Sequence, residues 1–200
     1  MNWKLLVTSF ITLTVIIDPI GNSPVFLVLT GDATDSRRRR FAGEAVLAAA
    51  GVIFVFALFG NYILAYLGIS LQSLMVAGGI LLGIVALDMM KGRVSPGEEA
   101  RSANVALVPL GTPLLGGPGA VVAAMVLMER SQTASDKLLV AAGIAAALLV
   151  VWVALRLAGR LVRLLRGTGV DLLTRVMGIL LAAIAAEFIH QAVVSWIAQG

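Results

Sequence analysis

Asp18-Pro19-Ile20-Gly21-Asn22-Ser23-Pro24 is a polar, turn-forming stretch inside an apolar run that extends from residue 5 to residue 29. An apolar run of this length can cross the roughly 30 Å hydrocarbon core of a bilayer. The residue before a proline is disfavoured in the helical conformation, so we expect a first half-helix to end near Ile17. Asn22 or Ser23 can cap a new half-helix whose first residue is Pro24. The stretch therefore predicts a membrane-spanning helix that is broken in its middle.

The composition supports a membrane protein. Of the 200 residues, 60% are hydrophobic and 13% are charged, whereas charged residues make up about a quarter of soluble domains. The net charge of +4 is not a sign of nucleic-acid binding, because basic residues beside apolar spans are typical of cytoplasmic loops. The chain has no cysteine, which excludes disulfides, thiolate metal sites and thiol catalysis.

Apolar runs of about 20 residues recur along the chain and predict an all-α polytopic protein with six transmembrane helices. The runs cover residues 5–29, 45–66, 71–90, 105–128, 138–161 and 172–197. A polar, basic connection is expected over 31–40 and a tight hairpin over 68–70. The distribution of lysine and arginine predicts the orientation, because 12 lie near the loops after the odd-numbered spans and 3 lie on the other side. Cytoplasmic loops carry the excess, so both termini are predicted outside the cytoplasm.

The broken span has a counterpart in the second half of the chain. Pro19 and Pro24 recur as Pro113 and Pro118, with the same spacing and a shift of 94 positions. Two halves of three spans each must have opposite orientations in the membrane, so the repeat is inverted, as in many secondary transporters. We therefore expect a first three-helix repeat over residues 1–95, a cytoplasmic linker over 96–104 and an inverted repeat over 105–200, each repeat starting with a broken helix.

A second match between the halves involves glycines and carboxylates. The sequence Gly-Ile-Leu-Leu-Gly at 79–83 matches Gly-Ile-Leu-Leu-Ala at 178–182, at a shift of 99. Asp88 and Glu187 follow these motifs at equal distances, and the inverted symmetry would place them towards opposite faces of the membrane. Both are candidate gating residues, while the alternative is that apolar, glycine-rich segments match by chance.

Two helix breaks inside a membrane can form one ligand site. Each break offers free backbone N–H groups and the positive end of a helix dipole, which suit an anion such as an amino-acid carboxylate. Asp18 and the freed carbonyl groups suit an ammonium group or a cation. The alternative is a pair of kinks without any ligand. The predicted substrate-binding residues are Asp18, Pro19, Gly21, Asn22, Ser23, Thr112, Gly116, Gly117, Pro118 and Gly119.

Four motifs give the sequence a resemblance to the MarC family of bacterial and archaeal inner-membrane proteins, also called the neutral amino acid transporter family. They lie at 18–27 (DPIGNSPVFL), 68–71 (GISL), 77–82 (AGGILL) and 113–120 (PLLGGPGA). The resemblance covers essentially the whole chain. It implies a six-span protein of the cell inner membrane, distantly similar to the LysE-type exporter superfamily, in which some archaeal members carry glycine, alanine and other neutral amino acids.

Together these features predict a secondary transporter for small neutral amino acids or similar metabolites, working by alternating access. We expect a zwitterionic substrate, the lipid bilayer and a homo-oligomer as candidate partners, with H+ or Na+ as candidate coupling ions. No metal site or cofactor is predicted. No catalytic residue is predicted either, because Ser23 has no histidine near it in the sequence and His190 is the only histidine of the chain. Efflux of another solute, a membrane-embedded enzyme and a non-transporting scaffold are the competing hypotheses.

Overall fold

The computed structural model describes residues 3–31, 33–92 and 115–199, and these residues form helices and no strands. The helices are α1 (Trp3–Ile17), α2 (Pro19–Leu29), α3 (Asp35–Leu67), α4 (Leu71–Met90), α5 (Pro118–Glu129), α6 (Ala134–Arg156) and α7 (Ala158–Gln199). The prediction of an all-α membrane protein is confirmed, because five segments are long and apolar enough to cross a membrane.

The five candidate spans agree with five of the six predicted runs. They are Trp3–Leu29, Asp35–Leu67, Leu71–Met90, Ala134–Arg156 and Gly167–Ala198. The first consists of α1 and α2 together and is broken at Asp18, as predicted. In the predicted run 105–128, the described part is the shorter apolar helix α5, and residues 105–114 lie outside the described part of the chain. The same holds for the predicted linker over 96–104.

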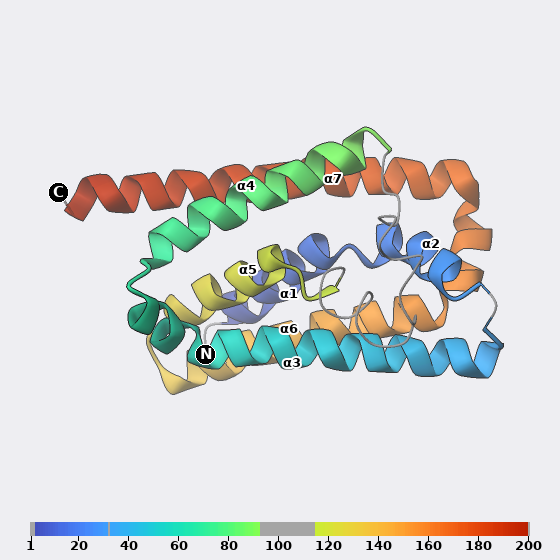
Figure 1. Ribbon diagram of the computed structural model, residues 1–200, viewed down its shortest axis with the longest axis horizontal. Helices are drawn as coiled ribbons and strands as arrows, with labels where there is room; N and C mark the ends of the chain where they lie inside the picture. Colours follow the sequence, from blue (N-terminus) through green and yellow to red (C-terminus); the bar gives the residue numbers. More distant parts are fainter. Residues whose placement is uncertain (1–2, 32, 93–114, 200) are drawn as a thin grey trace.

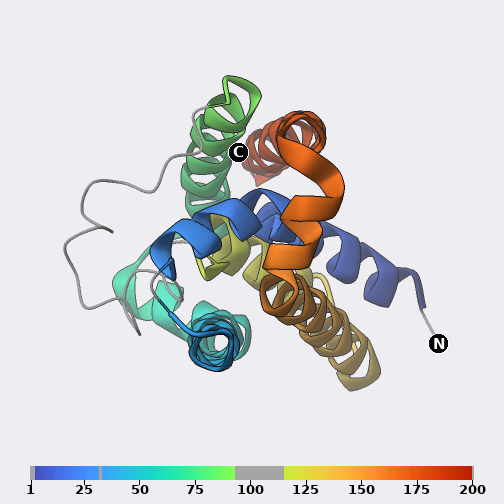
Figure 2. The ribbon, with the colours of Figure 1, turned by 90° about the vertical axis from the view of Figure 1, so that its right-hand side faces the viewer.

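The helices are arranged around a central group. Figures 1 and 2 show α4 beside α7 on one side of the molecule, α3 beside α6 on the other, and α1, α2 and α5 between these two pairs. Figure 1 also shows both termini towards the end at which α3 turns into α4. The buried apolar side chains, among them Leu13, Ile17, Phe26, Ile53 and Ile144, form one core between the layers. The broken span therefore lies in the middle of the bundle.

Reciprocal glycine contacts hold α4 against α7. A methyl group built on Gly79 would lie 2.7 Å from Ile189 and 2.8 Å from the carbonyl oxygen of Ala185. On the other helix, a methyl group on Gly178 would lie 3.1 Å from the carbonyl oxygen of Ala86. Each glycine thus packs directly against the backbone of the opposite helix. Small residues permit this close approach between membrane helices.

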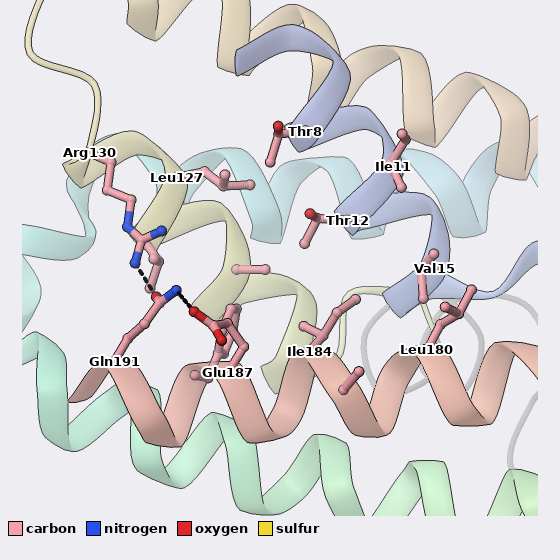
Figure 3. A pocket seen from close by; sticks show the side chains of 14 residues that line it. Thr8, Ile11, Thr12, Val15, Leu127, Arg130, Leu180, Ile184, Glu187 and Gln191 are labelled. Atoms are coloured by element: carbon pink, nitrogen blue, oxygen red, sulfur yellow. Dashed lines mark hydrogen bonds between the residues drawn. The ribbon is translucent and has the colours of Figure 1, made fainter. Parts of the chain in front are cut away.

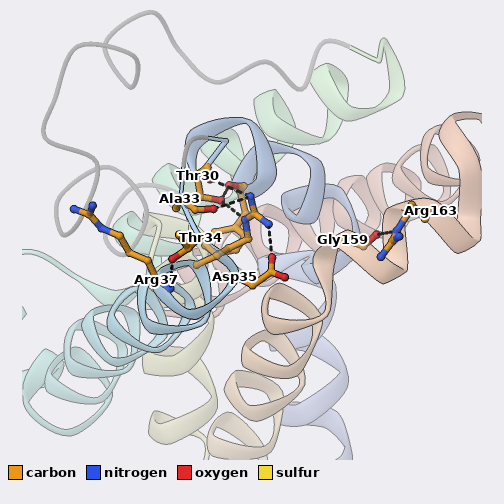
Figure 4. A network of polar contacts seen from close by, with 9 residues as sticks. Thr30, Ala33, Thr34, Asp35, Arg37, Gly159 and Arg163 are labelled. Atoms are coloured by element: carbon orange, nitrogen blue, oxygen red, sulfur yellow. Dashed lines mark hydrogen bonds and ion pairs between the residues drawn. The ribbon is translucent and has the colours of Figure 1, made fainter.

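The connection between α2 and α3 is shorter than predicted. Residues 31–40 were expected to be a polar connection, but α3 already begins at Asp35, with the Thr34 side chain accepting a hydrogen bond from the Arg37 amide. Arg38 closes the connection by donating to the carbonyl oxygens of Thr30 and Ala33, at 3.2 and 3.4 Å (Figure 4). The arginine thereby binds carbonyl groups at the end of α2, where positive charge is favourable.

The hairpin over 68–70 is confirmed. Gly68 has φ 66°, a left-handed conformation that glycine adopts without strain, and it ends α3. Ser70 begins α4 by accepting a hydrogen bond from the amide of Ser73 at 3.1 Å.

We predict that Gly143→Ala destabilises the contact between α1 and α6. The new methyl group would lie 2.7 Å from the carbonyl oxygen of Leu6 and would also collide with the buried hydroxyl of Ser9. Overpacking of this kind costs about 1–3 kcal/mol, which thermal unfolding in detergent measures. Gly159→Ala is the matched control, because a methyl group there meets nothing within 4 Å. Equal unfolding midpoints for the two variants would contradict the prediction.

Candidate functional site

The first break is a single residue in a left-handed conformation. Asp18 has φ 43° and ψ 75°, and its amide still donates to the carbonyl oxygen of Thr14 at 3.0 Å. Its side chain accepts a hydrogen bond from the amide of Gly21 at 3.1 Å, so the carboxylate caps the helix that follows. Asp18 is 6% exposed and therefore buried. The break thus changes the direction of the chain while α1 and α2 stay closely joined.

The start of the second half-helix corrects the prediction made from the sequence. The helix was expected to begin at Pro24, but α2 begins at Pro19 and Pro24 lies inside it. Asn22 does not cap the helix: its side-chain amide donates to the carbonyl oxygen of Ile17 at 2.5 Å. The hydroxyl of Ser23, which is fully buried, donates to the carbonyl oxygen of Pro19 at 2.7 Å. The polar side chains of the break therefore bind its own backbone.

The second break has a different chemistry. Gly117 is the N-terminal cap of α5, and Pro118 is the first helical residue, as predicted. Gly117 supplies no side-chain hydrogen bond to the helix, whereas Asp18 does so at the first break. Gly116 and Gly119 are buried, and Thr112 lies outside the described residues. Among the described residues, the first break therefore carries a carboxylate at its helix start, whereas the helix start of the second offers backbone groups alone.

Each break packs against a long helix. A methyl group on Gly21 would lie 3.3 Å from the hydroxyl of Thr174, which places the first break against α7. A methyl group on Gly119 would lie 2.8 Å from Cγ of Leu82, which places the second break against α4. The two helices that meet at the reciprocal glycines thus each support one break.

A cavity of about 470 Å³ opens between α1, α5 and α7 (Figure 3). Along α1 it extends from Thr8 to Val15, three residues before the first break. Its inner wall is apolar and includes the buried side chains of Val126, Leu127 and Phe188. The volume lies within the usual range of small-molecule sites, about 300–1,000 Å³.

A chain of polar side chains crosses one end of the cavity. Arg130 at the end of α5 donates to the side-chain oxygen of Gln191 on α7. The nitrogen of the same Gln191 amide donates to the carboxylate of Glu187, one turn earlier on α7 (Figure 3). A cation and an anion therefore face the same cavity with a neutral amide between them.

The cavity lies beside the predicted site and does not contain it. The nine predicted substrate-binding residues within the described part of the chain are all absent from its lining. Of the two candidate gating residues, Glu187 lines the cavity and Asp88 is exposed near the end of α4. Glu187 also lies 4.0 Å from the exposed His190.

The sequence contained a weak signal for the cavity residues. Ile11, Thr12 and Val15 follow Thr8 by three, four and seven residues, so the four side chains lie on one face of α1. Glu187 and Gln191 are four residues apart on α7, which also places them together. The pairing of these two faces with Arg130 depends on how the helices pack.

Comparison with known proteins gives the family. The family described as MarC family integral membrane protein matches residues 3–197. The UPF0056 membrane protein MJ1677 of Methanocaldococcus jannaschii is 36% identical over 196 residues, covering 94% of this chain and 96% of that protein. The UPF0056 membrane protein YhcE of Escherichia coli is 35% identical over 188 residues, covering 90% of this chain and 87% of that protein. No solved structure matches. The chain therefore belongs to the MarC family of integral membrane proteins.

Proposed function

We propose that this protein is a secondary transporter that moves small neutral amino acids, such as glycine or alanine, or similar small metabolites across the inner membrane by alternating access. The observation that carries the proposal is the cavity beside the broken span. It enters the bundle along α1 and reaches Val15, three residues before Asp18. A solute in this cavity would approach an interrupted membrane helix, which is where secondary transporters bind their substrates.

The packing of the helices supports two inverted repeats. If α2 corresponds to α5, α3 to α6 and α4 to α7, the contacts that α2 makes with α6 and α7 have counterparts in those that α5 makes with α3 and α4. Gly79 contacts Ala185, and Gly178 contacts Ala86. The two pairs are related by a shift of 99 positions, which takes Gly79 to Gly178 and Ala86 to Ala185. On this reading, α5 is the described part of a sixth span.

Within this transporter, the breaks form the central site. The carboxylate at Asp18 suits the ammonium group of a zwitterion, and the uncapped start of α5 at Gly117 suits its carboxylate. Glu187 and Asp88 are gating residues towards opposite faces, and H+ or Na+ is the coupling ion. The excess of basic residues after the odd-numbered spans places both termini outside the cytoplasm.

Transport in proteoliposomes tests the proposal. The purified protein is expected to take up and exchange labelled glycine or alanine. The double variant Asp18→Asn, Gly117→Leu is expected to lose most of this transport. Asparagine keeps an oxygen that can cap α2 and tolerates the left-handed conformation. The first change therefore removes the charge and is expected to leave the fold intact. Gly117 has φ −59°, which leucine also adopts, so the second change fills the site without backbone strain.

The control variant is Gly51→Leu on the exposed face of α3, where a methyl group meets nothing within 4 Å. It adds the same side chain away from the site and is expected to transport at the wild-type rate. Absence of uptake and exchange by the wild type, or full activity of the double variant, would count against the proposal.

A further inference from the structure

Gln191 occupies the space between two opposite charges at the end of the cavity. Its oxygen accepts from Arg130 and its nitrogen donates to Glu187, so one planar amide joins the guanidinium to the carboxylate. The Glu187 side chain is 57% exposed, which leaves its carboxylate accessible from the cavity end. Neither charged group is in an ion pair with the other among the described residues.

The amide satisfies each charged group only in part. A guanidinium has five N–H donors and a carboxylate has about four lone-pair sites, whereas this amide gives each of them one neutral partner. Hydrogen bonds with one ionised partner are already stronger than neutral ones, and a ligand group of opposite charge adds a direct attraction between the two charges. A ligand with a carboxylate and an ammonium group on the same carbon offers an acceptor to Arg130 and a donor to Glu187, as the amide does, with a full charge on each.

We propose that the cavity end is an outer recognition site for α-amino acids in their zwitterionic form. Arg130 binds the ligand carboxylate, Glu187 binds the ligand ammonium group, and the Gln191 side chain is displaced. The apolar wall formed by Leu127 and Ile184 faces the ligand side chain and favours small or apolar ones over charged ones. This site is separate from the helix breaks. Its role as the first binding site of a transported solute rests on the proposed function, whereas the binding of an amino acid to it does not.

Ligand analogues test the two charged contacts separately. The full chain in lipid nanodiscs is incubated with labelled alanine, and unlabelled alanine, alaninamide and propionate compete for binding. Alaninamide lacks the carboxylate and propionate lacks the ammonium group. Wild-type protein is expected to bind alanine at least about tenfold more tightly than either analogue, since each lacks one charged hydrogen-bond partner.

Each charge-removing variant is expected to lose the preference for alanine over one of the two analogues. Arg130→Gln weakens alanine binding by about ten- to a hundredfold and leaves alaninamide unchanged. Glu187→Gln weakens alanine binding to a similar extent and leaves propionate unchanged. Gln191→Ala leaves alanine binding equal or tighter, because the internal competitor is gone. These patterns differ from that of an unfolded protein, which would lose all three compounds together.

The matched controls remove a positive or a negative charge at positions on α7 that do not line the cavity. Arg175→Gln and Asp171→Asn, both at exposed positions, are expected to bind alanine as the wild type does. If Arg130→Gln or Glu187→Gln does not fold, Arg130→Lys and Glu187→Asp keep the charge and test the geometry, with weaker alanine binding expected. Failure of the wild type to bind alanine, or equal losses for all compounds in folded variants, would overturn the proposal.

The result also separates this site from the transport function. Alanine binding that depends on Arg130 and Glu187, without any uptake into proteoliposomes, would uphold the recognition site and remove the proposed function. Alanine uptake with unchanged KM in Arg130→Gln and Glu187→Gln would uphold the function and remove the recognition site.

Discussion

Replacing Asp18 by alanine is expected to destabilise the folded protein by about 2 kcal/mol or more. Alanine at φ 43° suffers the steric penalty of the left-handed conformation, about 1–2 kcal/mol. It also removes the cap on the Gly21 amide, which contributes about 0.5–2 kcal/mol. Unfolding of the purified protein in detergent, followed by loss of helical circular dichroism, measures the change.

Asparagine at the same position separates the cap from the charge. Its side chain retains an oxygen for the Gly21 amide and tolerates the left-handed conformation, so Asp18→Asn is expected to unfold close to the wild type. Asp171→Ala, an exposed aspartate on α7, controls for simple loss of a carboxylate. If Asp18→Ala unfolds at the same midpoint as Asp171→Ala, the carboxylate is not the element that holds the break.

Gly79→Ala is expected to have a comparable effect, because it forces α4 and α7 apart. The added methyl group would lie 2.7 Å from Ile189 and 2.8 Å from the backbone oxygen of Ala185, and a backbone atom cannot rotate away. We expect a loss of about 2–3 kcal/mol, the upper part of the range for overpacking. Gly178→Ala is expected to cost less, since its nearest contacts are 3.0 and 3.1 Å.

The two glycines should also be coupled. Once one methyl group has separated the helices, the second one meets less resistance, so the double variant is expected to lose less than the sum of the single losses. Gly51→Ala is the control, because Gly51 is also inside a helix but its methyl group meets nothing within 4 Å. Thermal unfolding of the wild type and the four variants gives the comparison. A Gly79→Ala midpoint equal to that of Gly51→Ala would contradict the close packing.

The first break shows what the sequence could predict and where the prediction erred. Asp18 before Pro19 indicated that a helix ends, and α1 does end at Ile17. The same two residues also form a cap followed by a first-turn proline, which is a helix start. The prediction assigned that start to Pro24, but Asp18 caps a helix that begins five residues earlier, at Pro19. Pro24 lies inside this helix, although an interior proline removes a hydrogen bond and crowds the preceding turn.

The ends of α3 differ in how well the sequence predicted them. Its C-terminal end was predictable because Gly68 and Ser70 are strong local signals. Its start was misplaced because hydropathy detects the membrane span and not the helix. Arginine is a good helix former, so the basic segment continues the helix back to the cap at Thr34.

The cavity was beyond prediction from the sequence. Its polar residues come from α1, α5 and α7, and Thr8 and Gln191 stand at opposite ends of the chain. Each helix face is recognisable alone, but the register in which three faces meet depends on the packing of the whole bundle. Glu187 was singled out only through its symmetry with Asp88, and that argument gave no indication of Arg130 or Gln191.

The length of α3 links the bilayer to the cavity. Its 33 residues extend over about 50 Å, well beyond the roughly 30 Å of hydrocarbon. Because the helix is continuous and longer than the hydrocarbon is thick, it can span the membrane with some tilt and with its basic first turns beyond the hydrocarbon. Near its other end, the side chain of Asn61 donates to Glu129, the neighbour of Arg130 at the cavity end. α3 therefore connects the part of the span that extends beyond the hydrocarbon to the end of α5 that carries Arg130, so the cavity end is held by a helix outside its own lining.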